Sequence, residues 1–151
     1  MDGIAVAKPL PSAGYSGKSL PDKLGFKAGM SALFVALPDP LAALPSSVDF
    51  AVAETRDQWP KVSGTARYDT IHAFTTSHAE IAKNLARLQK AIKRDGMIWV
   101  SWPKKSAKVS TDVTEDVVRA EALKLDLVDV KVAAVDEVWS GLKLVIRKER
   151  R

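Results

Sequence analysis

Residues 68–102 read YDTIHAFTTSHAEIAKNLARLQKAIKRDGMIWVSW and place one helix between two apolar strands. Both strand segments, residues 68–75 and 97–102, are rich in β-branched and aromatic side chains. The second is almost continuously apolar, which is typical of a strand buried on both faces. Two strands joined through a helix pair in parallel by a right-handed crossover. This stretch therefore predicts an α/β fold with a mostly parallel sheet.

The helix between these strands is marked at both ends. Ser77 and Glu80 have the spacing of a capping box, and Asp95-Gly96 is a helix-ending pair. Apolar residues recur along one face of this helix, at Ile81, Leu85, Leu88 and Ile92. Basic residues repeat the same spacing on the opposite face, at Lys83, Arg87, Lys90 and Arg94. We expect the apolar face to pack on the sheet and the basic face to be solvated.

Two more strands are predicted before this unit. Residues 30–37, MSALFVAL, form a continuous apolar run bounded by Gly29 and Pro38, and predict a central strand. Residues 48–53, VDFAVA, predict a second strand.

The remaining N-terminal segments predict short helices and an arm. Residues 39–44 predict a short helix with a proline at its first position, and residues 20–24 predict one helical turn. Residues 1–18 are rich in proline, glycine and small side chains and predict an irregular arm. The α/β domain is then expected to span residues 19–151.

A helix and a hairpin are predicted after the central unit. Asp112 and Glu115 have the spacing of a second capping box, for a helix that runs to about residue 125. Residues 127–135 and 139–147 predict two strands whose short connection forces an antiparallel hairpin. Since helices alternate with the preceding strands, we expect a three-layer sandwich with helices on both faces of the sheet.

The composition is that of an ordinary globular domain. Of the 151 residues, 46% are hydrophobic and 27% are charged. No segment approaches the roughly 20 apolar residues of a membrane span, and the N-terminus lacks the pattern of a secretory signal. The chain has no cysteine, which excludes disulfides, thiolate metal sites and cysteine catalysis. We expect a soluble, cytoplasmic protein that does not bind membranes.

Charge is unevenly placed along the chain. The formal net charge is +5, and basic residues dominate positions 83–108 while acidic residues dominate positions 109–146. Such asymmetry can steer anionic ligands or pair protein surfaces, although two solvated faces of opposite charge explain it as well. Charge alone is a weak signal for nucleic acid, and no nucleic-acid-binding motif is present.

The candidate functional residues lie where two predicted strands end. The first group lies at the end of the strand at residues 97–102 and just after it: Trp102, Lys104, Lys105 and Ser106. The second group follows the strand at residues 68–75: Thr76, Ser77 and His78. Ligands of open α/β sheets bind outside the carboxyl ends of the strands. Two ammonium groups, several hydroxyls and an indole suit a phosphate or a carboxylate, so we expect an anionic small molecule or a protein partner at this edge.

Signals for a cofactor or a metal are weak. Dinucleotide and methyl-donor sites use a glycine-rich turn after the first strand, whereas this chain has Leu37-Pro38-Asp39-Pro40 there. Gly17-Lys18-Ser19 resembles the end of a phosphate-binding loop, but the preceding glycine and strand are missing. His72 lies among apolar residues and predicts a hydrogen-bonded core histidine rather than a metal ligand. We expect no cofactor, no metal and no catalytic residue.

Four segments resemble an uncharacterised bacterial family of small proteins: AGYSGKSLPDKLGFKAGM from residue 13, IWVSWPKK from 98, TDVTEDVVR from 111, and LVDVKVAAVDEVWSGLKLVIRK from 127. The fold of that family is similar to the class I S-adenosylmethionine-dependent methyltransferases, so the resemblance implies a Rossmann-like, methyltransferase-like sheet. One strand-helix unit of the first half is missing from this chain. Glu54 follows the predicted second strand, where methyltransferases place an acid for the ribose.

Three functions remain open at this point. The first is a non-catalytic, degenerate methyltransferase-like domain that binds an anionic small molecule or a protein partner. The second is a small enzyme that uses S-adenosylmethionine. The third is a weak nucleic-acid-binding protein, which the absence of a recognition motif disfavours.

Overall fold

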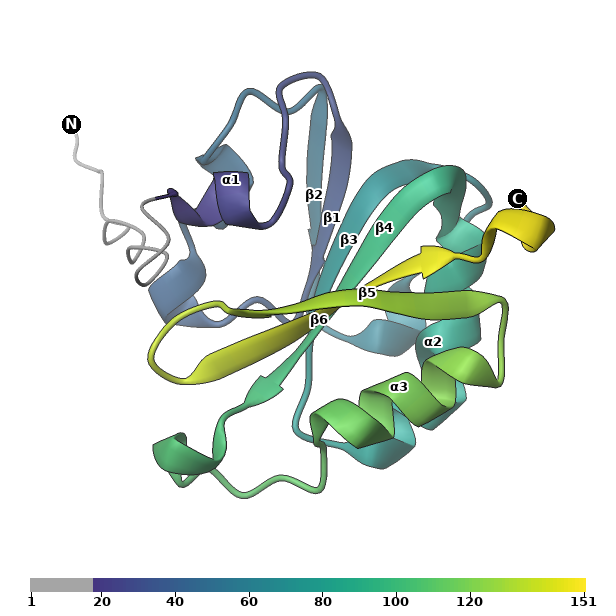
Figure 1. The fold of residues 1–151 in the computed structure, drawn as a ribbon. Coiled ribbons are helices and arrows are strands. Elements are labelled where there is room, and N and C mark those ends of the chain that lie inside the picture. Colours follow the sequence, from purple (N-terminus) through teal and green to yellow (C-terminus); the bar gives the residue numbers. More distant parts are fainter. Residues whose placement is uncertain (1–17) are drawn as a thin grey trace, which may run out of the picture.

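The computed structural model describes residues 18–151 (Figure 1). All but Lys18 of the predicted arm, residues 1–18, therefore lies outside the described residues. In this described part of the chain, three α-helices and six strands follow one another, with short 3₁₀ turns between some of them. In chain order they are α1 Leu20–Lys23, β1 Ser31–Val35, β2 Val52–Arg56, β3 Tyr68–Phe74, α2 His78–Ala91, β4 Ile92–Pro103, α3 Glu115–Leu123, β5 Leu127–Ala134 and β6 Trp139–Ile146.

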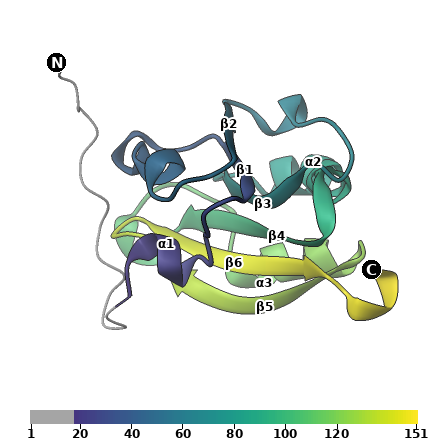
Figure 2. The same ribbon diagram turned by 90° about the horizontal axis from the view of Figure 1, so that it is seen from above.

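The six strands form one sheet in the order β2-β1-β3-β4-β6-β5, and Figure 2 shows them in this order from top to bottom. The first four strands are parallel, while β6 runs antiparallel to both β4 and β5. The predicted fold class is confirmed, a mostly parallel α/β sheet with a C-terminal antiparallel hairpin. The parallel strands β1, β3 and β4 all end at one edge, which is where the candidate residues lie.

The two faces of the sheet are covered differently. Helices α2 and α3 lie side by side on one face (Figure 1), over apolar residues such as Leu33, Ile71 and Val100. The other face is covered by the short helix α1, by 3₁₀ turns and by packed aromatic rings that include Phe34 and Trp99. Helices were expected on both faces, but both long helices are on the same one.

Two predicted elements near β1 are different in the structure. Residues 39–44 do not form one helix; the 3₁₀ turns Asp39–Leu41 and Leu44–Ser46 lie there instead, each with a proline as its second residue. Pro45 has no N–H to donate to the Leu41 carbonyl, so a helix begun at Pro40 is not extended past Leu44. The second strand begins at Val52 rather than at residue 48. Phe50 instead packs edge-on against Phe26, 5.6 Å between ring centroids, so the chain pairs with β1 only beyond that ring.

Ser77 caps α2, as predicted, but Glu80 does not complete a capping box. The Ser77 hydroxyl accepts from the Glu80 N–H at 3.2 Å, whereas the Glu80 carboxylate accepts from the Thr75 hydroxyl at 2.6 Å. The helix ends at Ala91, before the predicted Asp95-Gly96, because Ile92 already pairs with Tyr68 in the sheet. Hence β4 begins five residues earlier than residue 97.

The cap of α3 is not the predicted one. Thr114 precedes the helix, and its hydroxyl accepts from the Val117 N–H at 3.2 Å. Asp112, predicted to cap α3, accepts instead from the His78 N–H at 2.7 Å. This carboxylate therefore stabilises the start of α2 and ties the loop after β4 to it.

Candidate functional site

A hollow of about 700 Å³ opens at the carboxyl end of β4. Its walls come from the end of β4, from the loop that follows, from the start of α3 and from one residue of β6. The lining residues are Trp102, Pro103, Lys104, Lys105, Val109, Thr111, Val113, Thr114, Glu115, Asp116 and Ser140.

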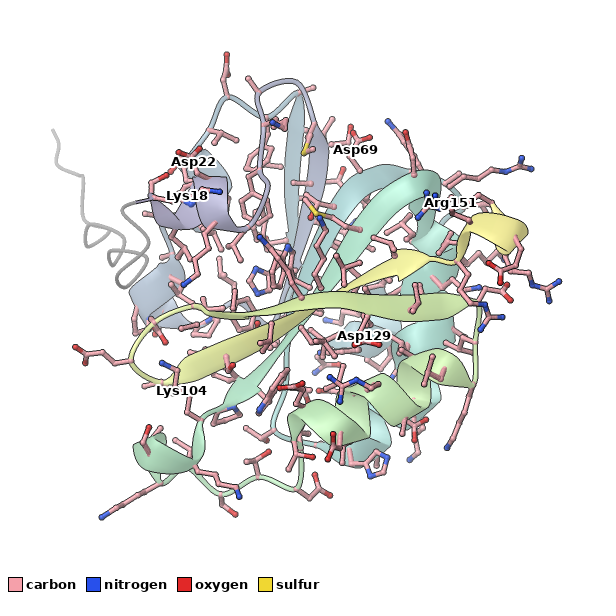
Figure 3. The ribbon with its side chains drawn as sticks, viewed as in Figure 1. Lys18, Asp22, Asp69, Lys104, Asp129 and Arg151 are labelled. Atoms are coloured by element: carbon pink, nitrogen blue, oxygen red, sulfur yellow. The ribbon has the colours of Figure 1, made fainter. Side chains whose placement is uncertain are left out.

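The loop after β4 is fixed to the β5–β6 hairpin. The Lys104 N–H donates to the Val138 carbonyl at 2.7 Å, and Figure 3 shows Lys104 beside the hairpin. The hairpin turn is itself held by Asp136, whose carboxylate accepts from the N–H groups of Val138 and Trp139 at 2.9 and 2.7 Å. Trp102 is only 6% exposed, so it forms part of the floor rather than a mobile flap.

The predicted residues of the second group adjoin the hollow without lining it. The Thr76 carbonyl accepts from the Thr111 hydroxyl at 2.8 Å, and Thr111 lines the hollow. Ser77 caps α2, and the His78 ring lies 2.9 Å from the Glu121 carboxylate of α3. The end of β3 thus supports the loop, while His78 is engaged between the two helices.

Of the first group, three residues line the hollow: Trp102, Lys104 and Lys105. Ser106 lies next to Lys105 in the 3₁₀ turn Lys105–Ala107 and is not among the lining residues.

Charge in the hollow is divided between free cations and paired acids. The Arg119 guanidinium binds the carboxylates of Glu115 and Asp116, the latter at 2.9 Å, which offsets part of their charge. Hydrogen bonds to Glu115, and then to Asp129, raise the pKa of Arg119. Among residues 18–151, neither Lys104 nor Lys105 forms an ion pair with a carboxylate. Lys104 and Lys105 are therefore the charged lining residues that form no ion pair within residues 18–151.

Sequence reasoning missed most of the other lining residues, among them Thr111, Val113, Thr114 and Ser140. A signal for Ser140 was present, because an antiparallel partner of β4 places Ser140 directly opposite Trp102. The residues at 111–114 carried no such signal, since their position depends on contacts with α2 and on the true start of α3.

The ends of β1 and β2 have a different character. Ala36 follows β1 with φ 54°, a left-handed conformation, and its N–H donates to the Arg56 carbonyl at 2.8 Å. Beside them, the fully buried Trp59 donates its indole N–H to the Phe74 carbonyl at 2.9 Å. A second hollow, of about 550 Å³, is lined by residues 45–50 and Ala53. Neither hollow includes residues 36–39.

Glu54 does not occupy the position that the sequence predicted for it. It lies inside β2, two residues before the strand ends, rather than after the strand. Its carboxylate accepts from the Tyr68 hydroxyl at 2.5 Å and pairs with Arg67 and Arg56 at 3.4 and 3.5 Å. The Tyr68 hydrogen bond, aided by the two arginines, lowers the pKa of Glu54. This acid therefore has a structural role in the sheet.

His72 is a core residue, as predicted. Its ring is fully buried, stacks on Phe74 with 4.3 Å between centroids, and lies 2.7 Å from the Ser101 hydroxyl. Burial lowers the pKa of His72 to about 3, so the ring is neutral at physiological pH.

Within residues 18–151, no three metal-binding side chains converge. None of the helices in this part of the chain is both long enough and apolar enough to cross a bilayer.

No family model and no curated protein sequence matches the chain. Solved structures do match it. The magnesium protoporphyrin IX methyltransferase of Synechocystis PCC 6803, with bound SAH, superimposes with a TM-score of 0.62 at 10% identity, over 84% of this chain and 78% of that one. A TehB-like SAM-dependent methyltransferase from Corynebacterium glutamicum gives 0.61 at 12% identity, over 85% of each chain. A SAM-dependent methyltransferase from Aquifex aeolicus gives 0.62 at 18% identity, over 83% and 87%.

The chain has a class I methyltransferase-like fold. At these identities the likeness concerns the fold and not the activity. Membership in a separate family of small bacterial proteins stays a prediction.

Proposed function

We propose that this chain is a non-catalytic, methyltransferase-like domain that binds an anionic small molecule in the hollow at the end of β4. The observation that carries the proposal is the pair of lysines that line that hollow. Lys104 and Lys105 have no carboxylate partner among residues 18–151, whereas the two acids that line the hollow are bound by Arg119. Unpaired ammonium groups beside hydroxyls suit a phosphate or carboxylate group.

The end of β1 supports the non-catalytic half of the proposal. A methyl-donor site needs a glycine-rich turn that lets the backbone approach the cofactor and offers N–H donors. Here Pro38 and Pro40 have no N–H, and the next residues form 3₁₀ turns rather than a long helix. The Ala36 N–H is already bonded to β2.

Calorimetry tests the site directly. Nucleotides, sugar phosphates and dicarboxylates should be titrated into the wild-type chain, into a Lys104→Ala/Lys105→Ala variant and into a Lys83→Ala/Lys90→Ala variant. The control lysines are exposed on α2 and also lack carboxylate partners in the described chain. We expect at least one anion to bind the wild type and the control equally and the site variant at least about ten-fold more weakly. Equal binding by all three would refute the site.

A second function, a small S-adenosylmethionine-using enzyme, is supported by the fold match to methyltransferases, one of them with bound SAH. It predicts that S-adenosylmethionine or SAH raises the melting temperature of the chain in a saturable manner. Such a rise would contradict the non-catalytic proposal, and no rise at millimolar ligand would support it.

A further inference from the structure

A bulge in β5 places two lysines opposite each other. Asp129 pairs with Leu144 of β6, and the next paired residue is Lys131, which pairs with Lys143. Val130 is the extra residue of the bulge. Without it, strict alternation would set Val130 against Lys143 and Lys131 against Leu142, so the Lys131 side chain would point to the α3 face. The bulge turns Lys131 to the same face as Lys143, and bulges commonly re-aim a side chain in this way.

The surroundings of the two lysines do not neutralise them. In the part of the chain that the structure describes, neither makes an ion pair. Asp129, the acid nearest to Lys131 along the strand, is bound by Arg119 of α3 at 3.0 Å. Like charges directly opposite on neighbouring strands are destabilising. The fold thus holds an electrostatic conflict that a bound anion would relieve.

Lys143 is more than a surface charge. It is partly buried and pairs in the sheet with Trp99, a fully buried residue of the aromatic cluster on the α1 face. Burial, and then the charge of Lys131, lower the pKa of Lys143. Val130 and Val132, on either side of Lys131, are 52% and 50% exposed. The pair therefore combines one partly desolvated ammonium group with one exposed group that can move to meet a ligand.

We propose that Lys131 and Lys143 form a binding site for a phosphate group, on the α1 face of the hairpin. This site is separate from the hollow, because Trp102 and Leu142 belong to the cluster under α2 and α3, while Trp99 belongs to the opposite cluster. It does not depend on the function proposed above. Directly opposed residues of an antiparallel pair have Cβ atoms about 5 Å apart, so two ammonium groups can contact oxygens of one phosphate group or of a diphosphate.

The test uses inorganic pyrophosphate as the probe and the Lys104→Ala/Lys105→Ala chain as the background, so that the hollow contributes nothing. Three variants are compared in that background: Lys131→Met, Lys131→Arg and the control Lys90→Met. Lys131 is exposed, so its replacement leaves the buried clusters intact. Melting temperature is measured with and without pyrophosphate, and affinity is measured by calorimetry.

We expect Lys131→Met to melt at a higher temperature than its parent without pyrophosphate, because the repulsion is removed. We also expect it to bind pyrophosphate at least about ten-fold more weakly. Lys131→Arg should keep the binding, and Lys90→Met should change neither quantity. Equal pyrophosphate binding by Lys131→Met and its parent would overturn the proposal, as would a parent that pyrophosphate does not stabilise. Either result leaves the test of the hollow unaffected.

Discussion

His72 has no charged partner among residues 18–151, and its ring is neutral in the folded protein. This makes it a source of acid sensitivity. Its pKa is lowered from 6.5 to about 3 by burial. Between these values the unfolded chain binds a proton that the folded chain does not. Stability from this group is therefore fully present above pH 6.5 and is lost as the pH falls toward 3.

Below pH 6.5, we expect His72 alone to lower the free energy of unfolding by up to about 1.4 kcal/mol for each pH unit. Urea denaturation at pH 7.0, 6.0 and 5.0 measures it, in a range above the titration of ordinary carboxylates. A His72→Gln variant should lose this part of the pH dependence, and His78→Gln should keep it. An unchanged slope in His72→Gln would show that another group is responsible.

Gly141 lies beside Ser101, the hydrogen-bond partner of the buried His72, and a side chain does not fit there. A Cβ at this position would lie 2.8 Å from the Ser101 hydroxyl and 3.2 Å from the Trp99 ring. We expect Gly141→Ala to destabilise the fold by about 1–3 kcal/mol, since an overpacked core must shift. Thermal denaturation checks this, with the neighbouring Ser140→Ala as a control near zero. A wild-type melting temperature in Gly141→Ala would contradict the crowding argument.

These residues also show how far single positions could be predicted. His72 was assigned correctly because its neighbours in the sequence are apolar, and a strand shows its own burial pattern. Glu54 was placed wrongly because its role depends on Tyr68, fourteen residues away in sequence and two strands away in the sheet. A partner of that kind leaves no periodic signal.

At the scale of elements, Asp112 links the loop after β4 to α2. Its carboxylate accepts from the His78 N–H at 2.7 Å, in the first turn of the helix. We expect Asp112→Ala to lower stability by about 1 kcal/mol, as for the loss of a helix cap. Faster amide hydrogen exchange at His78 would identify the cause. Asp116→Ala, whose side chain is 93% exposed, is the matched control. Unchanged exchange at His78 would mean that the bond contributes nothing.

Elements with a repeating pattern were predicted well and those without one were not. Helix α2, strand β3 and the second half of β4 follow from their apolar patterns, although residues 92–96, predicted to be helix and its end, belong to β4. The hairpin follows from its short connection. The start of β2 was missed because Phe50 packs on Phe26, a contact between distant segments. The hollow was predicted in part, since Trp102, Lys104 and Lys105 follow a recognisable strand, whereas Thr111 and Thr114 reach it only through tertiary contacts.

At the scale of the molecule, the unequal covering of the sheet makes one short helix important. Leu24 follows α1, is fully buried in the cluster on the face without long helices, and its carbonyl accepts from the Trp99 indole at 2.9 Å. We expect Leu24→Ala to destabilise the protein by about 2–5 kcal/mol. Leu123→Ala on α3, where the side chain is 50% exposed, should change stability little. Denaturant unfolding followed by Trp fluorescence measures both, and equal effects would contradict this account.

The position of β6 in the sheet also has a consequence for biosynthesis. This strand lies between β4 and β5, yet the ribosome makes it after both. While the nascent chain ends at Ala134, β4 has an unpaired edge and β5 has no strand to join. The second half of the sheet can therefore close only after translation has passed Ile146. Until then the growing chain exposes the unpaired backbone N–H and C=O groups along one edge of β4.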